Sequence, residues 1–347
     1  MAMAAKRVTI VDVAMLAGVA VSSASAALNG RPGVSEKTRE RIQNAAAELN
    51  FVPSLNAQSL PSKRAFAVGL VVQRSSDVLE SDPFFGAFIA GVETVLPQYN
   101  YALVLHVGVD REDAASRYRE MAASRRVDGA FLLDLEVNDP RIKLLRELGM
   151  PTVGINANHD EAALASVRQD SALAINQAVD CLVNLGHRVI GHVSGLPQYV
   201  HSQQRMEAWK TSLERWSLHP GPLIQGDFTY DGGQRAADAV LQCSQRPTAV
   251  ICANDLSAIG FIRRLQDLGL NVPADMSVVG FDGIDLGTYL RPSLTTVQTT
   301  PHLIGERAAQ LLLDIVHGEP VADIEIPPAE LVLRESTGVA PTMAEVV

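Results

Sequence analysis

The hydrophobic pattern divides the chain into a short helical part and a long alternating part. From Phe66 onward, apolar runs of strand length alternate with amphipathic helical segments; for example, AVGLVVQ precedes FGAFIAGVETVL, and TAVICAN precedes LSAIGFIRRLQDLG. This alternation predicts parallel sheets with helices on both faces. It occurs twice, over roughly residues 66–160 and 165–290, so we expect two doubly wound α/β lobes, with the later segments crossing back between them.

The first fifty residues instead predict short helices. Thr9 can cap a helix on which Val13, Leu16 and Ala17 share one face. Gly18 can end this helix, because glycine readily adopts the left-handed turn of a helix C-terminus. The first predicted helix is therefore about two turns long and has its apolar face toward a core.

Two more helices are predicted behind the Gly18 turn. The second runs from about Val21 to Leu28 and is stopped by Asn29-Gly30. Ser35 can cap the third, EKTRERIQNAAAELN. Its apolar stripe consists of Ile42, Ala45, Ala46 and Leu49. Three short helices with a glycine turn between the first two are typical of a helix-turn-helix head.

The same N-terminal stretch also has features of a secretory signal. Lys6 and Arg7 precede a short apolar run, and Ala24-Ser25-Ala26 is similar to a signal cleavage site. Asp12 interrupts the apolar run, however, and a cleaved signal would not need the capped, basic third helix behind it. We therefore expect a retained head in a cytoplasmic protein rather than an exported one.

Charge is distributed unevenly between the two parts of the chain. Residues 1–64 contain eight Lys and Arg against four Asp and Glu, whereas the whole chain has a formal net charge of −10. A basic head on an acidic body indicates that only the head meets a polyanion. The alternative is an ordinary fluctuation of solvated surface charge.

Composition and motifs exclude several other classes of protein. The hydrophobic content of 47% is that of a globular protein, and no apolar run reaches the ~18 residues that a membrane span needs. The three cysteines form no C-x-x-C pair, which favours a reducing compartment. We find no G-x-S-x-G, H-E-x-x-H, P-loop or G-x-G-x-x-G motif, and the histidines lack metal-ligand spacing. We therefore expect no enzyme, no catalytic residues, no cofactor, no metal and no membrane partner.

The segment VTIVDVAMLAGVAVSSASAALNGRPGVSEKTRERIQNAAAELNFVPS closely resembles the DNA-binding head of the lactose-repressor/galactose-repressor (LacI/GalR) family. Further matches, such as DPFFGAFIAGVE, ICANDLSAIGF, DMSVVGFDGID and ELVLRESTG, continue along nearly the whole chain. The resemblance implies a small all-α helix-turn-helix head and an α/β two-lobed body like that of periplasmic binding proteins. The implied domains are a head at 1–52, a hinge and linker at 53–65 and a body at 66–340. The lobes are expected at about 66–160 with 295–325, and at 161–294 with 326–340.

The resemblance also implies which residues of the head read DNA. Its second helix would enter the major groove, with Val21, Ser22 and Ala26 as base readers. Ala26 stands where the family often has arginine, so a strong contact to guanine is missing. The residues implied as phosphate contacts are Ser23, Ser25, Asn29 and Thr38. Ala20 stands where the family usually has a capping serine.

Residues 53–65, PSLNAQSLPSKRA, are similar to the family's hinge helix. This helix is too short to be stable alone, and in the family it pairs with its copy and inserts a leucine into the minor groove. Leu60 matches that leucine, and Ala57 lies on the same helix face. Asn56 and Pro61 depart from the family pattern, and a simple linker is the alternative interpretation.

Polar residues follow several predicted strands of the body. Asn156 follows TVGI, Asn254 and Asp255 end TAVICAN, and Asp282 ends SVVGFD. Ligands of such sheets bind beyond the carboxyl ends of the strands. Asp255 can instead cap the following helix, and Asn254 can do the same.

The resemblance implies an effector site between the lobes. Arg205, at the start of RMEAWKTSL, would be a polar clamp together with Asn254 and Asp282, and Asn156 stands where aspartate is frequent. The aromatic residues implied to face the ligand are Phe84, Phe85 and Phe228. Guanidinium and carboxylate groups hold hydroxyls while flat apolar faces pack against a ring, which favours a sugar or sugar derivative. A purine-like ligand is the alternative, as is a core position for Phe84 or Phe85; Trp209 is expected in the core.

Together these features predict a homodimeric, sequence-specific transcriptional regulator that acts as a repressor. Two heads would bind a near-palindromic operator in double-stranded DNA, and a small sugar-like effector would alter lobe closure. No leucine-heptad tail is recognisable, which favours a dimer over a tetramer. The rival interpretations are an exported or cytoplasmic sugar-binding protein with a non-functional head, and an enzyme on the same body fold.

The hinge assignment predicts the effect of removing the leucine wedge. Leu60→Ala should weaken binding to the specific operator more than binding to random duplex, because the wedge acts only where DNA can kink. Fluorescence anisotropy on both duplexes at one salt concentration measures the ratio. An equal loss on both would contradict the hinge assignment.

Overall fold

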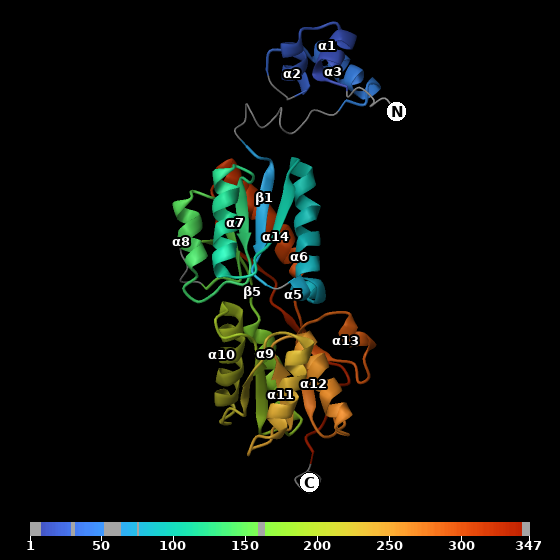
Figure 1. Ribbon diagram of the computed structural model, residues 1–347. Helices are drawn as coiled ribbons and strands as arrows, with labels where there is room; N and C mark the ends of the chain where they lie inside the picture. Colours follow the sequence, from blue (N-terminus) through green and yellow to red (C-terminus); the bar gives the residue numbers. More distant parts are fainter. Residues whose placement is uncertain (1–7, 29–31, 52–63, 75, 159–163, 342–347) are drawn as a thin grey trace, which may run out of the picture. The chain divides into compact units, whose positions relative to one another are not determined.

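The computed structural model describes residues 8–28, 32–51, 64–74, 76–158 and 164–341 (Figure 1). The chain divides into two compact units, Met1–Phe66 and Ala67–Val347. We refer to them as the head and the body.

The head contains the three predicted helices. They are α1 (Ile10–Ala17), α2 (Val21–Leu28) and α3 (Glu36–Glu48). Thr9 begins α1, and its backbone N–H and hydroxyl both donate to the carboxylate of Asp12, at 2.8 and 2.7 Å. Gly18 ends α1 with a left-handed φ of 62°. The glycine turn between α1 and α2 is therefore confirmed.

Small side chains build the core of the head. Its buried residues are Val13, Ala14, Ala17, Ala24, Ala27, Ile42, Ala45 and Ala46. The prediction for Leu16 is wrong, because this side chain is 47% exposed. At 100° per residue, Val13, Ala14 and Ala17 lie within one arc of α1, and Leu16 falls outside it. The narrow gap between the helices is filled by Ala14 instead.

The body consists of two six-stranded sheets. In the first, the strands are ordered β11 (Ile324–Ile326), β5 (Ala165–Gln169), β4 (Thr152–Ile155), β3 (Gly129–Leu132), β1 (Ala67–Val72) and β2 (Ala102–Val107). In the second, the order is β12 (Glu330–Val332), β10 (Thr295–Gln298), β9 (Ser277–Asp282), β8 (Ala249–Cys252), β6 (Ile190–Ser194) and β7 (Leu223–Gln225). All neighbours are parallel except β10 and β12. Two doubly wound sheets were predicted, and both are present.

Helices connect the strands and cover the sheets. Those with the first sheet are α5 (Ser76–Ser81), α6 (Pro83–Val95), the 3-10 turn η1 (Leu96–Tyr99), α7 (Arg111–Ala123), α8 (Pro140–Glu147) and α14 (Pro301–His317). Those with the second are α9 (Ala172–Asn184), α10 (Val200–Arg215), α11 (Tyr230–Leu241), α12 (Asp255–Asp267) and α13 (Leu286–Tyr289). We call the two groups lobe 1 and lobe 2. Trp209 of α10 lies in the core of lobe 2, as predicted, and stacks on His192.

The chain crosses between the lobes later than predicted. Strand β5 (165–169) belongs to lobe 1, and β10 (295–298) belongs to lobe 2. β5 has the sequence ASVRQ, which lacks an apolar run. The strand can still be buried, because Arg168 forms an ion pair with Asp323 at 2.6 Å. Polar burial of this kind hides a strand from hydrophobic patterning.

Two glycines bring α6 and α14 into close contact, and Figure 1 shows these helices side by side on lobe 1. A Cβ at Gly91 would lie 1.9 Å from the carbonyl oxygen of His302, and one at Gly305 would lie 2.1 Å from that of Phe88. Only glycine permits this approach. The contact fixes the N-terminus of α6 close to the point where α14 begins.

The start of α2 generates a prediction about the head. Ala20 precedes α2, and its carbonyl accepts hydrogen bonds from the amides of Ser23 and Ala24. Because alanine has no side-chain acceptor for a first-turn amide, Ala20→Ser should stabilise α2 by about 0.5–2 kcal/mol. Hydrogen exchange over Val21–Leu28 in the full chain measures this.

The control is Ala47→Ser, at an exposed position inside α3 where serine caps nothing. It should leave the exchange of α2 unchanged. Unchanged exchange of α2 in Ala20→Ser would show that the helix start needs no cap.

Candidate functional site

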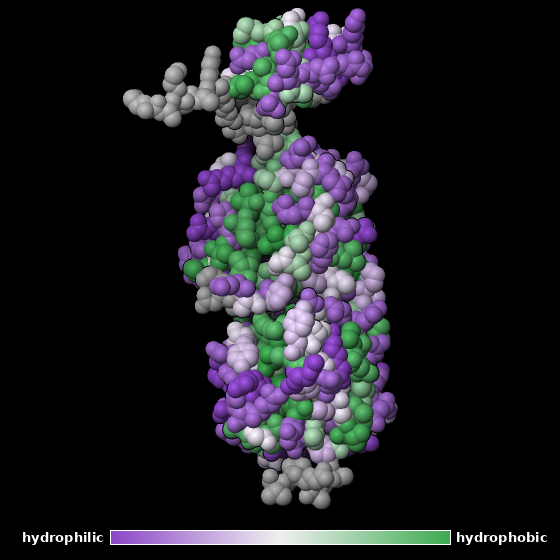
Figure 2. Space-filling view, turned by 90° about the vertical axis from the view of Figure 1, so that its right-hand side faces the viewer, coloured by the Kyte–Doolittle hydropathy of each residue, from purple (hydrophilic) through white to green (hydrophobic). Residues whose placement is uncertain are grey.

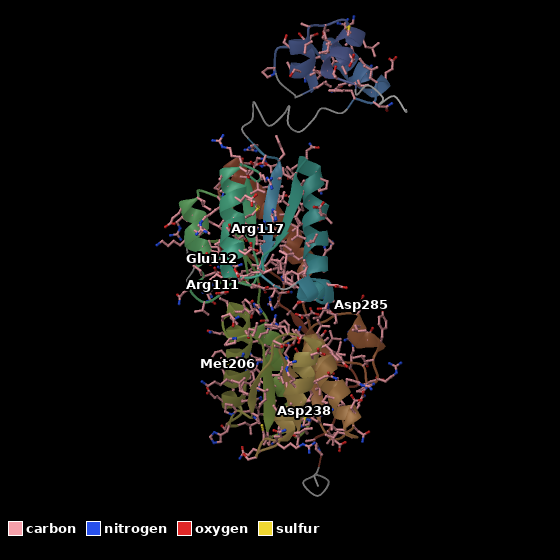
Figure 3. All side chains as sticks on the ribbon, in the orientation of Figure 1. Arg111, Glu112, Arg117, Met206, Asp238 and Asp285 are labelled. Carbon is pink, nitrogen blue, oxygen red and sulfur yellow. The ribbon has the colours of Figure 1, made fainter. Side chains whose placement is uncertain are left out.

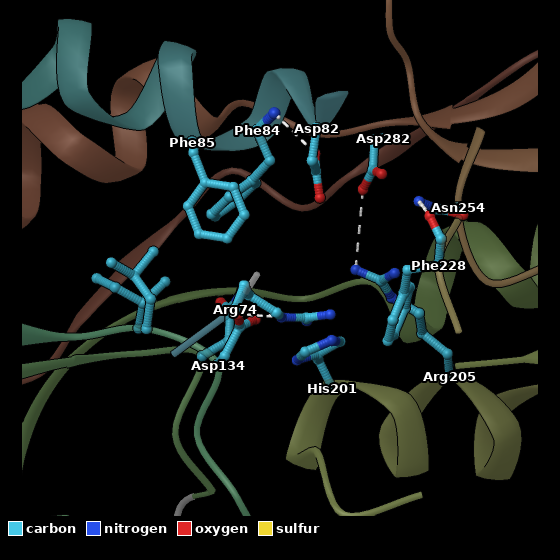
Figure 4. A pocket seen from close by; sticks show the side chains of 13 residues that line it. Arg74, Asp82, Phe84, Phe85, Asp134, His201, Arg205, Phe228, Asn254 and Asp282 are labelled. Carbon is cyan, nitrogen blue, oxygen red and sulfur yellow. Dashed lines mark hydrogen bonds and ion pairs between the residues drawn. The ribbon is translucent and has the colours of Figure 1, made fainter. Parts of the chain in front are cut away.

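A cavity lies between the two lobes at the carboxyl ends of their strands (Figure 4). It encloses about 560 Å³, part of which is open to solvent. Lobe 1 contributes Arg74, Asp82, Phe84, Phe85, Leu133, Asp134, Ile155 and Asn156, and lobe 2 contributes His201, Arg205, Phe228, Asn254 and Asp282. All seven residues predicted for an effector site therefore line one cavity.

Arg205 is a largely buried cation of the cavity. Its guanidinium lies 3.5 Å from the ring centre of Phe281, and its Nη1 donates to the carbonyl oxygen of Ala253 at 2.5 Å. Its Nη2 lies 4.0 Å from Oδ1 of Asp282, and among the described residues its buried Nε has no hydrogen-bond partner. Burial lowers the pKa of Arg205, and Asp282 opposes this shift. The α10 helix begins at Val200, so Arg205 is not at the helix start as predicted but in its second turn.

Asp282 presents an open carboxylate to the same cavity. It ends β9 with a φ of 111°, which is strained for a residue with a side chain. Within the described ranges, no donor lies within hydrogen-bond distance of its carboxylate oxygens. Burial raises its pKa well above the ordinary value, and Arg205 opposes this. The carboxyl oxygens of Asp282 are therefore available for hydrogen bonds to a ligand.

Arg74 was not predicted, although it spans the two lobes. It follows β1, and its Nε donates to Oδ2 of Asp134 at 2.7 Å. Its guanidinium carbon also lies 4.4 Å from the ring centre of Tyr199 and 5.1 Å from that of Phe228, both in lobe 2. Burial lowers the pKa of Arg74, but Asp134 more than offsets this. One face of Phe228 is thus covered by a cation of the opposite lobe.

Backbone hydrogen bonds join the lobes next to Arg74. The amide of Val137 donates to the carbonyl of Gln198 at 2.9 Å, and that of Val200 donates to Leu135 at 2.8 Å. Between them Glu136 and Tyr199 form an antiparallel bridge. The buried Glu136 side chain pairs with Arg111, which is labelled in Figure 3. The lobes are therefore closed on this side of the cavity.

His201 and Asp82 are the other residues that the sequence did not indicate. His201 stacks on Tyr199 at 5.5 Å between ring centres and lies 5.3 Å from Phe228. Burial lowers the pKa of His201 to about 3, so the ring is neutral at pH 7. Asp82 caps α6 by accepting from the amide of Phe84 at 3.0 Å. Burial raises the pKa of this carboxyl group.

The aromatic positions of lobe 1 differ in their surroundings. Phe85 is 2% exposed and packs edge-on against Phe84, at 5.7 Å between ring centres. Phe84 is half-buried and stacks on Phe88 at 6.2 Å. Phe84 is therefore better placed than Phe85 to offer a flat apolar surface to a ligand.

The roles of Asn254 and Asp255 differ from those that the sequence suggested. The expectation that Asp255 caps α12 is wrong, because Asn254 is the cap and accepts from the amide of Ser257 at 3.0 Å. Asn254 also donates to the carbonyl of Phe228 at 2.8 Å. Both ends of its amide are thus used within the protein, so Asn254 positions the wall of the cavity.

Asp255 supports the loop that follows Asp282. Its Oδ2 accepts from the amides of Gly283 and Ile284 at 2.9 and 2.8 Å, and its Oδ1 accepts from the hydroxyl of Thr296 at 2.6 Å. Burial raises the pKa of Asp255 to about 6. The ends of β8, β9 and β10 are therefore tied together by one buried carboxylate.

Asn156 is also held within lobe 1. Its Oδ1 accepts from the amide of Gln169 at 2.9 Å, and its φ is 54°.

The head exposes part of the predicted reading surface. Val21 is 43% exposed and Ser22 is exposed, whereas Ser23, Ser25 and Ala26 are half-buried along α2. Thr38 shares a hydrogen bond with the hydroxyl of Ser35 at 2.9 Å. The residues Asn29, Asn56, Ala57, Leu60 and Pro61, and with them positions 53–63 of the hinge, lie outside the described residues.

Over the described ranges, no group of three or more His, Cys, Asp or Glu side chains could hold a metal ion. No single helix in this part of the chain is long and apolar enough to cross a membrane; α1 and α2 pass that test only as a pair, and they are bent by 103°. The bend is the Gly18 turn of the head.

Comparison with known proteins gives a family match in each of the two units. Residues 9–54 match the family described as bacterial regulatory proteins, lacI family, and residues 179–337 match the periplasmic binding protein-like domain. The chain is 30% identical to catabolite control protein A of Priestia megaterium over 95% of this chain and 99% of that protein. It is 31% identical to the HTH-type transcriptional repressor CytR of Escherichia coli over 96% and 97%.

Solved structures show the same arrangement of elements. A complex of the transcriptional regulator CelR with cellobiose has a TM-score of 0.74 at 31% identity and covers 95% of this chain and 100% of that one. A lac repressor dimer bound to operator and the anti-inducer ONPF has a TM-score of 0.83 at 28% identity, over 96% and 100%. A helix-turn-helix head on a two-lobed binding body defines a DNA-binding transcriptional regulator. The chain belongs to the lacI family of bacterial regulatory proteins.

The buried carboxylate of Asp255 predicts a pH dependence of stability. Its pKa of about 6 lies above the ordinary value of 3.8, so between about pH 4 and 6 the folded protein keeps a proton that the unfolded chain releases. This contribution to stability therefore falls as the pH rises through that window. Asp255→Asn cannot titrate, so its free energy of unfolding relative to the parent should rise by up to about 3 kcal/mol from pH 4 to pH 7.

Urea unfolding at several pH values measures this difference. The control is Asp267→Asn, at the exposed end of the same helix, which should follow the parent profile. A pH-independent difference between Asp255→Asn and the parent would mean that Asp255 does not titrate in this range.

Proposed function

We propose that this protein is a cytoplasmic, homodimeric transcriptional repressor whose operator affinity is set by a sugar-like effector bound between its lobes. The observation that carries the proposal is the opposition of free donors and free acceptors in the cavity. Nη2 of Arg205 lies 4.0 Å from Oδ1 of Asp282, beyond direct hydrogen-bond distance. A hydroxyl both donates and accepts, so a polyol satisfies the two groups together.

The walls of the cavity combine charged groups with a small apolar surface. Arg74 lies over one face of Phe228, at 5.1 Å from its ring centre. Phe84 remains as a single apolar surface, which suits one face of a sugar ring. The CelR relative was solved in complex with cellobiose, which is also a sugar. We assign no catalytic role to any side chain of the cavity.

The position of the cavity explains how an effector would act. Asp82 and Phe84 belong to lobe 1, and Arg205 and Asp282 belong to lobe 2. A ligand that contacts both pairs binds the closed arrangement more tightly than the open one, and it shifts the equilibrium by that difference in affinity. The resemblance to the family implies that this movement reaches DNA through the hinge at 53–65.

A homodimer would place two heads on the two halves of an operator. On the face shown in Figure 2, apolar surface is exposed on both lobes. The exposed apolar side chains include Leu105 of β2 and Leu286 and Tyr289 of α13, the last at 75%. Such side chains are favourable at a subunit contact. Each head would then read one half-site through Val21, Ser22 and Ala26.

The test is selection of bound duplexes from a randomised pool at fixed salt, followed by a panel of sugars on the enriched duplex. We expect a near-palindrome and at least one sugar that changes its affinity. Enrichment of no sequence, with or without sugars, would contradict the repressor proposal and favour a sugar-binding protein with a non-functional head.

Arg205→Ala tests the effector site separately from the head. The substitution removes the donors opposite Asp282, so the sugar should no longer change operator affinity even at concentrations about 100-fold above those that act on the parent. Fluorescence anisotropy on the selected duplex measures the response.

The matched control is Arg215→Ala, in the last turn of the same helix and half exposed. It should respond to the sugar as the parent does. A loss of duplex binding in Arg205→Ala that equals its loss of response would argue against the assignment of Arg205 to the effector.

A further inference from the structure

A second cavity adjoins the one that contains Arg205. It encloses about 930 Å³, part of it open to solvent, and exceeds the first in size. Its walls come from three places: the first turns of α6, the loop after β9, and the crossover from β10 into α14. Asp285, on the β9 side of this cavity, is labelled in Figure 3.

The two cavities meet at Phe84 and Asp282, which line both of them. Figure 4 shows these side chains at the upper side of the first cavity, beside Asp82. A molecule whose hydroxyl binds the carboxylate of Asp282 therefore lies next to the second cavity. The strained backbone of Asp282, with its φ of 111°, directs the carboxylate to this junction.

The chemistry of the two cavities differs. The first has two arginines and three aspartates among its lining residues. The second is lined by the apolar side chains of Pro83, Ala87, Ile284 and Leu303, by the neutral polar Gln298 and Thr299, and by the ionisable Asp282, Asp285 and His302. The Thr299 hydroxyl donates to the backbone oxygen of Asp282 at 3.1 Å, so its own oxygen can still accept. Such walls suit a second sugar ring, whose faces are apolar and whose edge carries hydroxyls.

We propose that the effector has two linked rings, one in the charged cavity and one in the adjoining cavity, and is therefore a disaccharide. This inference rests on the proposed function and specifies the size of its ligand. The second ring would contact α6 of lobe 1, the β9 loop of lobe 2 and the crossover between them. The second ring would thus lie where residues of both lobes come together.

The second ring supplies contacts to both lobes that a monosaccharide lacks. A monosaccharide in the charged cavity leaves the apolar walls to water, whereas a disaccharide covers them. Each extra contact to the closed arrangement adds to the difference in affinity that moves the equilibrium.

The experiment compares cellobiose, maltose, lactose and melibiose with glucose and galactose, their constituent monosaccharides. Isothermal calorimetry with the full-length dimer gives each affinity. At least one disaccharide should bind about tenfold or more tightly than either of its monosaccharides, which corresponds to about 1.4 kcal/mol.

A matched pair of variants locates the second ring. Ala87 of α6 lines the second cavity, and Ala90 lies on the exposed side of the same helix. Ala87→Trp should lower the affinity for the disaccharide about tenfold more than that for its monosaccharide, and Ala90→Trp should change neither. Ala87→Gln, a smaller change, repeats the measurement if the tryptophan variant does not fold by circular dichroism.

Each outcome decides the inference. A monosaccharide that binds as tightly as its disaccharides, or an Ala87 variant that weakens both equally, would overturn it while leaving the proposed function intact. Absence of binding by every disaccharide would also overturn it. The duplex selection described above is independent of sugar length, so failure of the repressor proposal would be recognised separately.

Discussion

A buried guanidinium needs a counter-charge, and in lobe 2 this need organises the cavity. Arg205 lies against Phe281 and depends on Asp282, which holds a strained φ of 111° at the end of β9. The loop after Asp282 is held in turn by the carboxylate of Asp255. An unpaired charge at this depth would cost several kcal/mol. The ends of three strands are therefore arranged around one cation, and the incomplete pairing of that cation is what a ligand can complete.

Lobe 1 repeats the same arrangement with different elements. Arg74 follows β1 and pairs with Asp134, which follows β3. Each lobe thus contributes one guanidinium and one carboxylate to the cavity; Arg205 lies on helix α10, and the other three groups lie at or just beyond the ends of strands. The two pairs differ in completeness, since Arg74 and Asp134 are in direct contact whereas Arg205 and Asp282 are 4.0 Å apart. The tight pair forms part of the closure between the lobes, and the loose pair remains available to a ligand.

Most of this architecture could be predicted from the sequence, and the failures have physical causes. Strand-end reasoning found Asn156 and Asp282 and would also have found Arg74 and Asp134, because both follow buried strands. It could not find His201, whose position depends on the packing of Tyr199. Leu16 was misplaced because two turns of helix leave the centre of an apolar face ambiguous. β5 was missed because an ion pair, rather than apolar side chains, permits its burial.

The close contact of α6 and α14 has a mechanical consequence. Because Gly91 and Gly305 leave no room for side chains between them, the two helices are coupled into one beam along lobe 1. The α14 part of this beam has 17 residues and so is about 25 Å long. One end of the beam carries Phe84 and the start of α14, where the two cavities meet. A tilt of about 3° at that end displaces the opposite end by roughly 1 Å over this length. A small tilt beside the cavities would therefore become a larger displacement at the far end of lobe 1.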